Sequence, residues 1–436
     1  MEKAVKVGLL GLGVVGTGVL EILADHKDKI EKSIGGPLVV TKALIRPEED
    51  KSALAEKYQL ELVTELDAIL NDPEIAIVVE VMGRIEPAKT FIKKALMAGK
   101  NVVTANKDLL AQHGTELVNL AREQQRNLYY EASVAGGIPI LRTIANSLAA
   151  DDITEVLGIV NGTTNYMLTK MVQEHRTYDE TLKEAQELGF AESDPTNDVD
   201  GIDAAYKMVI LSKFAFGMSI TMDQVKIKGI RGLAAEDVSI ADQLGYTVKL
   251  IGSTIKNDDT ISVEVGPVLV PHEHPLASIH NEMNAVFVKS SGIGESMYYG
   301  PGAGARPTAT SIVADLMTIV NKMKKNTVGH RFTGYTQPTK ITSPDENISK
   351  YFLSLEMPDE PGQFLKLAEI MTETKVGFEQ VVQEKGDGEN ARVVLITHET
   401  SETKMGTIQQ EIKEKTSYKL LSLMKVVGEY TCTKVY

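Results

Sequence analysis

The chain has 436 residues, of which 43% are hydrophobic and 24% charged, and 46 basic against 60 acidic residues leave a net charge of -14. A length beyond the roughly 150 residues of a typical domain predicts two or three domains of ordinary globular composition. The acidic balance, without a cluster of Lys and Arg, argues against a nucleic-acid partner. No apolar run approaches the roughly 20 residues that cross a bilayer, so no membrane partner is expected either.

The single cysteine, Cys432, lies near the C-terminus. One cysteine excludes an intrachain disulfide framework and a cysteine metal cluster, which favours a reducing, cytoplasmic location. The apolar stretch near the N-terminus is interrupted by glycines, and this pattern favours a buried strand entering a helix over a signal peptide.

Short β-branched runs alternate with amphipathic stretches over residues 1–135. This alternation predicts a Rossmann-type, doubly wound α/β domain. Thr64 and Pro87 mark expected helix starts, and a helix over residues 305–325, clearest at 310–323, is expected to pack back on this domain. The expected strands cover residues 5–10, 39–45, 75–81, 101–104 and 128–132.

A different pattern begins near residue 136 and predicts a central α+β domain that extends to residue 304. A strand is expected at 154–160, followed by helices to about residue 216. A strand-rich stretch at 248–288 and a glycine-dense turn at 299–305 complete this part of the chain.

Residues 333–350 are rich in Thr, Pro, Ser and charge, which is typical of a linker. After them the order of expected elements is β-α-β-β-α-β: strands at 351–357, 378–384, 391–397 and 420–429, and helices at 362–374 and 403–416. This order predicts a ferredoxin-like unit over residues 351–436.

A glycine-rich turn follows the first expected strand and opens a helix with G-x-G-x-x-G spacing. In such a turn the first glycine permits the sharp bend, the second lets the backbone approach a pyrophosphate, and the third allows close helix packing. The alternative is a turn that binds another phosphate, or no ligand. The predicted dinucleotide-binding residues are Gly11, Leu12, Gly13, Val14, Val15 and Gly16.

The second strand ends in Arg46, and acidic residues appear only at positions 48–50. An acid at this strand end would favour the ribose hydroxyl of NAD, whereas an arginine favours the 2′-phosphate of NADP. The sequence therefore prefers NADP slightly over NAD, with an unrelated exposed arginine as the alternative.

Five acids lie within the twelve residues from Glu192 to Asp203, and Lys207 follows four positions after the last of them. Asp203 and Lys207 would share one helical face. Because a surface pair at this spacing contributes only about 0.2–0.5 kcal/mol, stability alone hardly requires it. A lysine held beside carboxylates near a buried surface suits proton donation, and an ordinary solvated charge pair is the alternative.

Four strings over the first 330 residues resemble the homoserine dehydrogenase family. They occur in the family's order and are far more specific than the glycine turn. The strings are Val103-Thr104-Ala105-Asn106-Lys107, Glu131-Ala132-Ser133-Val134-Ala135-Gly136-Gly137-Ile138-Pro139, Asn161-Gly162-Thr163-Thr164-Asn165-Tyr166, and Gly189-Phe190-Ala191-Glu192-Ser193-Asp194-Pro195, which runs on to Asp198, Asp203 and Lys207.

The resemblance implies reversible hydride transfer between NAD(P)H and L-aspartate 4-semialdehyde, giving L-homoserine on the way to threonine and methionine. Lys207 resembles the family's proton donor, and Lys107 the lysine that contacts both substrate and nicotinamide. The substrate ammonium group would be bound by Glu192 and Asp203, with Asp198 nearby. Gly162 and Gly189 would add backbone contacts.

Further ligand contacts are implied by the resemblance. The cofactor contacts expected beyond the glycine turn and Lys107 are Gly83, Thr104 and Gly302. A monovalent cation, sodium, would be bound by Glu131, Val134, Gly136 and Ile138, since one carboxylate with carbonyl groups suits a hard cation; a purely structural turn is the alternative. The prolines around His272 and His274, without a third ligand, predict a loop there and no metal site.

The string Met357-Pro358-Asp359-Glu360-Pro361-Gly362 resembles the ACT domain, which commonly binds amino acids between paired copies. Feedback inhibition by L-threonine is the corresponding hypothesis, and a role in assembly alone is the alternative. The family resemblance also implies a homodimer formed through the central domain. Pairing of the C-terminal units would extend it to a homotetramer.

The sequence has features of two other classes of protein. A semialdehyde dehydrogenase that forms a thioester needs a nucleophilic cysteine, and Cys432 lies in the regulatory-looking unit. A non-catalytic sensor could combine dinucleotide and amino-acid binding. The presence of both Lys107 and Lys207 argues against the sensor.

Overall fold

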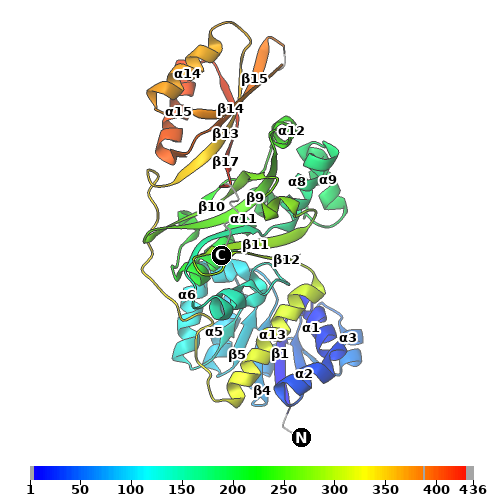
Figure 1. Ribbon diagram of the computed structural model, residues 1–436. Helices are drawn as coiled ribbons and strands as arrows, with labels where there is room; N and C mark the ends of the chain where they lie inside the picture. Colours follow the sequence, from blue (N-terminus) through cyan, green and yellow to red (C-terminus); the bar gives the residue numbers. More distant parts are fainter. Residues whose placement is uncertain (1–3, 386–387, 429–436) are drawn as a thin grey trace.

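The computed structural model describes residues 4–385 and 388–428, so Cys432 and the end of the last expected strand lie outside the described residues. Three parts follow one another along the long axis of the molecule in Figure 1. A parallel sheet with its helices lies at one end, a second sheet lies in the middle, and α14 and α15 lie at the far end.

The first sheet has six parallel strands among the described residues, in the order β3-β2-β1-β4-β5-β6. This order confirms the doubly wound fold. It reverses direction between β1 and β4, where ligands bind outside the carboxyl ends of the strands. The strands are β1 (Val5–Leu10), β2 (Leu38–Leu44), β3 (Glu61–Val63), β4 (Ile75–Glu80), β5 (Asn101–Thr104) and β6 (Leu128–Tyr129).

Three details of this sheet differ from the sequence prediction. The edge strand β3 was not predicted, because three residues are too few to show an alternating pattern. The strand expected at 128–132 ends at Tyr129, since a 3-10 turn, Glu131–Ser133, begins where the Glu131 N–H donates to Asp315 at 2.9 Å. The helix expected after Thr64 is a single turn, α4 (Asp67–Leu70).

Helices from two distant parts of the chain pack side by side on the first sheet. The returning helix α13 lies against α1 and β5. A Cβ atom on Gly18 of α1 would lie 2.6 Å from the Ala305 carbonyl oxygen, so glycine is required for this close approach. The helices of this part are α1 (Val14–Asp25), α2 (Lys27–Ile34), α3 (Ser52–Tyr58), α5 (Ala88–Met97), α6 (Lys107–Glu123) and α13 (Ala305–Lys324).

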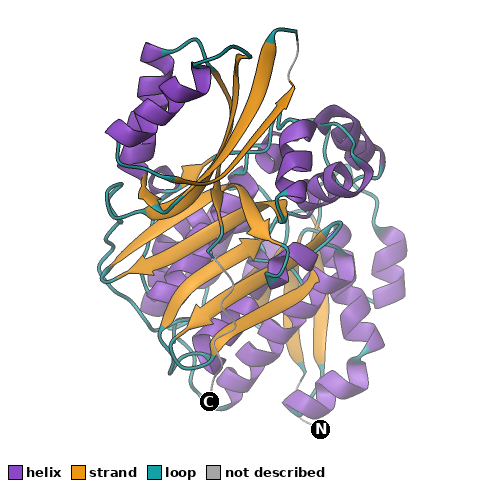
Figure 2. Ribbon diagram, turned by 45° about the horizontal axis from the view of Figure 1, so that its top comes forward, coloured by secondary structure: helices purple, strands orange, loops and turns teal. Residues whose placement is uncertain are grey.

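The second sheet runs from the middle of the molecule into the C-terminal part, as Figure 2 shows. Its 11 described strands follow the order β12-β11-β7-β9-β10-β17-β13-β15-β14, with β8 and β16 pairing to the side. Parallel pairing of Val268 with Lys425 and of Leu269 with Val426 joins the two halves. The strands are β7 (Ile153–Ile159), β8 (Lys226–Ile227), β9 (Tyr246–Asn257), β10 (Thr260–Pro271), β11 (Met283–Ser290), β12 (Gly294–Pro301), β13 (Ile348–Pro358), β14 (Phe378–Lys385), β15 (Asn390–Thr397), β16 (Thr400–Ser401) and β17 (Lys419–Val426).

The C-terminal strands confirm the expected ferredoxin-like order. Strands β17-β13-β15-β14 carry α14 (Gln363–Glu373) and α15 (Glu402–Lys415), and an apolar core that includes Leu353, Leu367 and Ile408 holds them together. The stretch expected as a linker is shorter than its predicted 333–350, because Ile341 bridges to Ile261 and β13 already begins at Ile348. Likewise β12 continues through Pro301, into the residues expected to form a glycine turn.

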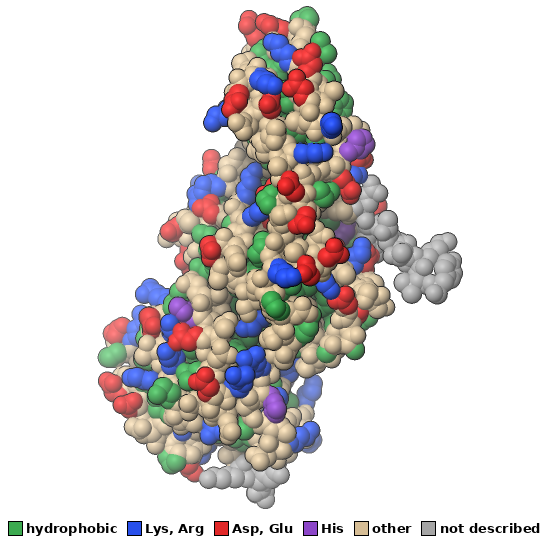
Figure 3. Space-filling view, turned by 90° about the vertical axis from the view of Figure 1, so that its left-hand side faces the viewer, with side chains coloured by type: hydrophobic (Ala, Val, Ile, Leu, Met, Phe, Trp, Pro, Cys, Tyr) green, Lys and Arg blue, Asp and Glu red, His purple; other side chains and the backbone are tan. Residues whose placement is uncertain are grey.

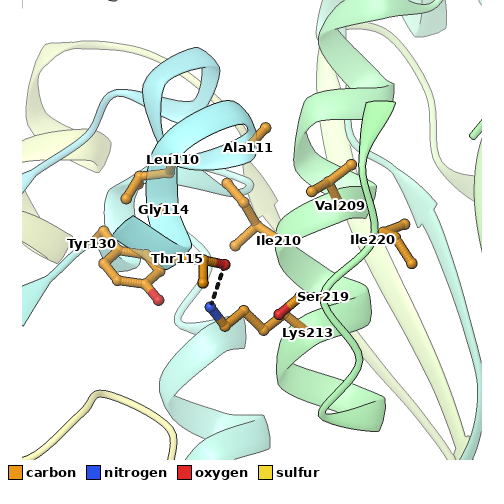
Figure 4. A pocket seen from close by; sticks show the side chains of 10 residues that line it. All are labelled: Leu110, Ala111, Gly114, Thr115, Tyr130, Val209, Ile210, Lys213, Ser219 and Ile220. Atoms are coloured by element: carbon orange, nitrogen blue, oxygen red, sulfur yellow. Dashed lines mark hydrogen bonds between the residues drawn. The ribbon is translucent and has the colours of Figure 1, made fainter. Parts of the chain in front are cut away.

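Helix α11 connects the two sheets. It packs against β9 and β10 on one side and against α6 on the other. Figure 4 shows the α6–α11 contact, which encloses a cavity of about 30 Å³ and in which the Lys213 Nζ lies 3.5 Å from the Thr115 Oγ1. Lys107 at the start of α6 and Lys207 on α11 are thereby brought to the same junction. The helices of the middle part are α7 (Ile140–Arg142), α8 (Gly162–Glu174), α9 (Tyr178–Glu187), α10 (Thr196–Val199), α11 (Ile202–Phe216) and α12 (Ala235–Gln243).

Lys and Arg side chains lie among Asp and Glu side chains on the face in Figure 3 instead of gathering in one patch. Within residues 4–385 and 388–428, no helix is long and apolar enough to cross a membrane.

Replacing Gly18 by alanine should destabilise the protein, because the new Cβ would collide with a backbone carbonyl of α13. Overpacking of this kind costs about 1–3 kcal/mol, and we expect a lower midpoint of thermal unfolding. The matched control is Gly114→Ala on α6, where the nearest atom to a new Cβ is 3.8 Å away. The higher helix propensity of alanine should stabilise that variant by up to about 1 kcal/mol. Equal midpoints for the two variants would contradict the tight α1–α13 contact.

Candidate functional site

The glycine turn has the geometry that its spacing predicts. Gly11 adopts a φ of +97°, a conformation that residues with side chains rarely adopt. A Cβ atom on Gly16 would lie 2.3 Å from the Gly11 carbonyl oxygen, so a side chain there would push α1 away from the turn. The roles expected for the first and third glycines are therefore visible in the backbone.

The backbone at this turn faces open space at Gly13. No side chain caps α1, so its first N–H groups point outward from Gly13, and a Cβ there would meet no atom within 4 Å. Such a helix start attracts anions. Gly83, after β4, also has a positive φ of +72° and faces open space. Val14 is 72% exposed, whereas Leu12 is buried, so Leu12 offers a ligand only its backbone.

Arg46 lies after β2, beside the turn, and is exposed. Its guanidinium group forms no ion pair or side-chain hydrogen bond with the part of the chain that the structure describes. The nearby acids at 48–50 do not engage it. A cation in this position is available for an anionic ligand group.

A buried acid organises the ends of β4 and β5, and sequence reasoning did not identify it. Glu80 accepts hydrogen bonds from the Thr104 Oγ1 at 2.6 Å and from the Met82 N–H at 2.8 Å, and burial raises the pKa of Glu80. Thr104 was expected to contact the cofactor; its side chain is fully buried and bonded to Glu80, so it offers a ligand only its backbone. Asn106 caps α6 through the Leu109 N–H at 3.2 Å and so fixes the start of the helix that carries Lys107.

The two predicted catalytic lysines meet on one carboxylate. The Lys207 Nζ lies 2.7 Å from the Asp203 Oδ2 and donates to the Val160 carbonyl at 2.5 Å. Lys107 is the first residue of α6, in the part built on the first sheet. Its Nζ lies 3.3 Å from the Asp203 Oδ1. Lys207 and Asp203 are both largely buried, at 9% exposure each. The expected helical pair is therefore part of a three-membered ionic cluster.

Electrostatics within the cluster follow from burial and charge. Burial alone would raise the pKa of Asp203, but the two ammonium groups of Lys207 and Lys107 outweigh it and lower that pKa to about 2. Burial would likewise lower the pKa of Lys107, but the carboxylates of Asp203 and Asp108 raise it overall. The carboxylate of Asp203 and the ammonium of Lys107 are therefore both charged at neutral pH.

Asn161 extends the cluster and was not singled out as a site residue. Its Nδ2 donates to the Asp198 Oδ1 at 2.7 Å and to the Asp203 Oδ2 at 2.9 Å, while its Oδ1 accepts the Thr164 N–H at 2.9 Å. An asparagine before a glycine at a helix start is a recognisable N-cap signal. Burial, together with the charge of Asp203, raises the pKa of Asp198.

The other expected substrate residues lie around this cluster with fewer contacts. A Cβ on Gly162 would lie 2.7 Å from the Glu282 carbonyl oxygen, so packing requires glycine there, and Gly189 has a φ of +76° in open space. Glu192 is exposed, and among the described residues its carboxylate has no hydrogen-bond or ion-pair partner. The structure therefore joins Asp198 to the cluster, whereas Glu192 forms no bond to it.

Gly302, an expected cofactor contact, packs tightly inside the protein. A Cβ on Gly302 would lie 2.1 Å from the Nδ2 of the buried Asn284. A Cβ on Gly136 would in turn lie 2.4 Å from the Gly302 carbonyl oxygen. Tight packing within the protein already accounts for the missing side chain.

The segment expected to bind sodium is organised by protein groups. The Glu131 carboxylate accepts the N–H groups of Leu141 and Arg142, each at 2.9 Å, and the Gly136 carbonyl accepts the Ser311 Oγ at 2.7 Å. Burial raises the pKa of Glu131 to about 7, against the opposing charge of Arg142. These contacts hold the turn in place, and a cation bound by Glu131, Val134, Gly136 and Ile138 stays a prediction.

The histidine pair lies in a loop, as expected. His274 is buried, and its Nδ1 accepts the Leu276 N–H at 3.1 Å. His272 is partly exposed beside Asp242. Within the described ranges, no group of three or more His, Cys, Asp or Glu side chains is placed to bind a metal ion.

Comparison with known proteins identifies the chain's relatives. Residues 11–131 match the homoserine dehydrogenase NAD-binding domain, and residues 139–317 match the homoserine dehydrogenase family model. The homoserine dehydrogenase of Lactococcus lactis is 52% identical over 426 residues, covering 98% of this chain and 100% of that protein.

Solved structures agree with this assignment. A homoserine dehydrogenase crystal structure from Thiobacillus denitrificans superposes with a TM-score of 0.92 at 36% identity, covering 98% of each chain. A hyperthermophilic archaeal homoserine dehydrogenase in complex with NADPH gives a TM-score of 0.62 at 29% identity, covering 73% of this chain and 98% of that one. With full-length relatives of this name and a matching nicotinamide dinucleotide domain beside the lysine cluster, the chain belongs to the homoserine dehydrogenase family.

Proposed function

We propose that the chain interconverts L-aspartate 4-semialdehyde and L-homoserine by NAD(P)-dependent hydride transfer, with Lys207 as the proton donor. The observation that carries this assignment of roles is the cluster of Lys207, Asp203 and Lys107. Lys107 follows β5, whose carboxyl end lies at the same edge of the sheet as the glycine turn after β1. The cluster therefore borders the crevice in which dinucleotides bind.

The reaction needs a proton as well as a hydride. When bound, the nicotinamide ring supplies a hydride to the aldehyde carbon in one direction and takes it back in the other. As the carbonyl oxygen gains negative charge, the Lys207 ammonium group donates a proton to it and becomes neutral. In the reverse direction the neutral amine removes the hydroxyl proton. The bonds to Asp203 and Val160 hold the Lys207 Nζ in place for both steps.

Lys107 supplies a second positive charge on the other oxygen of Asp203. Such a fixed charge stabilises the developing alkoxide without costly rearrangement of solvent. Asp198 and Glu192 provide negative charge for the substrate ammonium group. Asn161 donates to the carboxylates of Asp198 and Asp203 and so holds both in place. Gly162 and Gly189 would add backbone contacts to the substrate, and of the two only Gly189 faces open space.

Replacing Lys207 by alanine should lower kcat by about 10²–10⁴-fold, because the general acid is lost. The dissociation constant of the cofactor should stay unchanged, since Lys207 contacts Asp203 and Val160 and not the glycine turn. Homoserine-dependent reduction of the cofactor measures kcat, and fluorescence quenching measures cofactor binding.

Two further variants separate chemistry from folding. Lys213→Ala, on the same helix but bonded to Thr115, should retain near-normal kcat. Lys207→Arg keeps a cation beside Asp203 but releases its proton poorly, so it should fold normally and remain slow. A near-normal rate in Lys207→Arg and Lys207→Ala would remove this residue as the proton donor.

We further propose that the enzyme prefers NADP over NAD, because Arg46 is exposed and unpaired within the described chain. Arg46→Ala should raise the KM for NADP about 10-fold or more and leave the KM for NAD nearly unchanged, since one charge-assisted hydrogen bond to a phosphate is lost. Steady-state kinetics with both cofactors measure the effect. Lys51→Ala is the control for a general loss of positive charge, and a wild-type preference for NAD would contradict the assignment.

We also propose that L-threonine inhibits the enzyme through the C-terminal unit, and that the chain forms a homodimer or homotetramer. The support is the ferredoxin-like topology with the loop before α14, where Gly362 adopts a φ of +89°. Titration of threonine into the full chain should give heat and a parallel loss of activity. Light scattering on the same samples should give two or four times the 47.5 kDa chain mass. If threonine gives neither heat nor inhibition, the C-terminal unit serves assembly alone.

A further inference from the structure

The last residues of three neighbouring strands form one row at the carboxyl edge of the first sheet. Leu10 of β1 is in register with Glu80 of β4, and Glu80 is in register with Thr104 of β5. The glycine turn follows directly after Leu10, and Lys107 comes shortly after Thr104. Ligands of doubly wound sheets bind outside this edge. Glu80 therefore lies between the turn expected to hold the dinucleotide and the lysine of the ionic cluster.

One oxygen of the Glu80 carboxylate holds the loop that follows β4. Its Oε1 accepts the Met82 N–H at 2.8 Å, and the Gly83 N–H is a further donor to the carboxylate. Met82 packs on the glycine turn, because a Cβ on Gly11 would lie only 3.1 Å from the Met82 Cγ. Gly83 was expected to contact the cofactor and faces open space. This side of Glu80 therefore fixes the loop that borders the expected cofactor site.

The other oxygen of Glu80 fixes the start of α6. The Thr104 Oγ1 donates to the Glu80 Oε2 at 2.6 Å and in turn accepts the Asn106 N–H at 3.1 Å. Asn106 caps α6, and its Nδ2 donates to the Arg84 carbonyl at 2.6 Å, which ties the loop after β4 to the loop after β5. Lys107 is the first residue of α6, so these bonds set the position of its backbone.

A carboxylate is a costly group for packing alone. Glu80 is fully buried, and a buried carboxylate is tolerated only where donors satisfy it. The donors around Glu80 come from two loops at the ligand-facing edge, and hydrogen bonds to a charged acceptor are the short and strong ones. Reacting side chains must be held to within about 0.5 Å, which requires support from rigid neighbours. The bonds of Glu80 provide such support beneath Lys107.

We propose that Glu80 is a positioning residue, which holds Lys107 in a fixed place relative to the loop that faces the cofactor. Because its side chain is fully buried, Glu80 acts through Thr104 and Asn106 and not by contact with a ligand. The inference rests on the role of Lys107 proposed above. It adds the residue by which the cofactor side and the substrate side of the crevice are held together.

Thr104→Val tests the proposal, because it removes one link of this chain of bonds at nearly constant volume. Glu80 keeps its contacts with Met82 and Gly83 in this variant, so the Kd of the cofactor should stay unchanged. Displacement of Lys107 should lower kcat/KM for homoserine about 10-fold or more, since a misplacement of about 1 Å can cost as much as 10²-fold. Homoserine-dependent reduction of the cofactor and fluorescence quenching measure the two quantities, well below the unfolding temperature.

Thr397→Val is the matched control. Thr397 is equally buried, and its Oγ1 accepts the Tyr351 N–H at 3.0 Å within the C-terminal unit. Both valine variants leave one buried N–H without that acceptor, so both should unfold at a lower temperature than the wild type. Only Thr104→Val should be slow with homoserine. Equal losses of kcat/KM in the two variants would overturn the proposal, and so would normal kinetics in Thr104→Val.

Two further changes show whether the effect passes from Glu80 to Lys107. Glu80→Gln retains an oxygen for the loop N–H groups, but its amide nitrogen cannot accept the Thr104 hydroxyl, so it should match Thr104→Val in both measurements. Lys107→Ala and the double variant Lys107→Ala/Thr104→Val should have the same kcat/KM, because the second change then has no lysine left to displace. Losses that multiply in the double variant would overturn the proposal.

The wild type separates this inference from the proposed reaction. A wild-type chain that does not reduce the cofactor with homoserine contradicts the reaction, and this inference with it. An active wild type with a normal Thr104→Val or a normal Glu80→Gln contradicts the role of Glu80 alone.

Discussion

The carboxylate of Asp203 is the contact on which the arrangement of the site depends. A largely buried charge is tolerated only when it is paired, and Asp203 is paired twice, with Lys207 on its own helix and with Lys107 on α6. Because α6 belongs to the first sheet and α11 to the second, this one carboxylate joins the two parts of the molecule at the point where chemistry is expected. Loss of either lysine would leave this carboxylate with one cation in place of two.

Backbone features around the cluster keep that geometry fixed. Asn106 caps the helix that carries Lys107, and Asn161 caps α8 while bonding Asp198 and Asp203. Gly18 allows α13 to pack directly on α1. The chain therefore positions its ionic groups through caps and close helix contacts, which are stiffer than long side chains on a surface.

The C-terminal unit is attached by a few strong contacts. The buried Asp237 of α12 accepts the Arg392 Nη1 at 2.7 Å and also a hydrogen bond from Ser422, next to the short β10–β17 pairing. Ion pairs of Lys425 with Glu264 and of Lys226 with Glu402 cross the same junction. The unit is therefore held against the central strands by charged contacts as well as by strand pairing.

The sequence by itself determined the local features. These are the alternating strands of the first sheet, the glycine turn with its helix, the β-α-β-β-α-β order, and the shared face of Asp203 and Lys207. Each depends on residues close together in the chain, where periodicity, caps and φ preferences act. Only the tertiary structure decided that Lys107 shares Asp203, that Glu80 binds Thr104, that Gly302 packs on Asn284, and that β10 joins β17. Those contacts join residues far apart in sequence, so no local pattern encodes them; they appear only when the whole chain has packed.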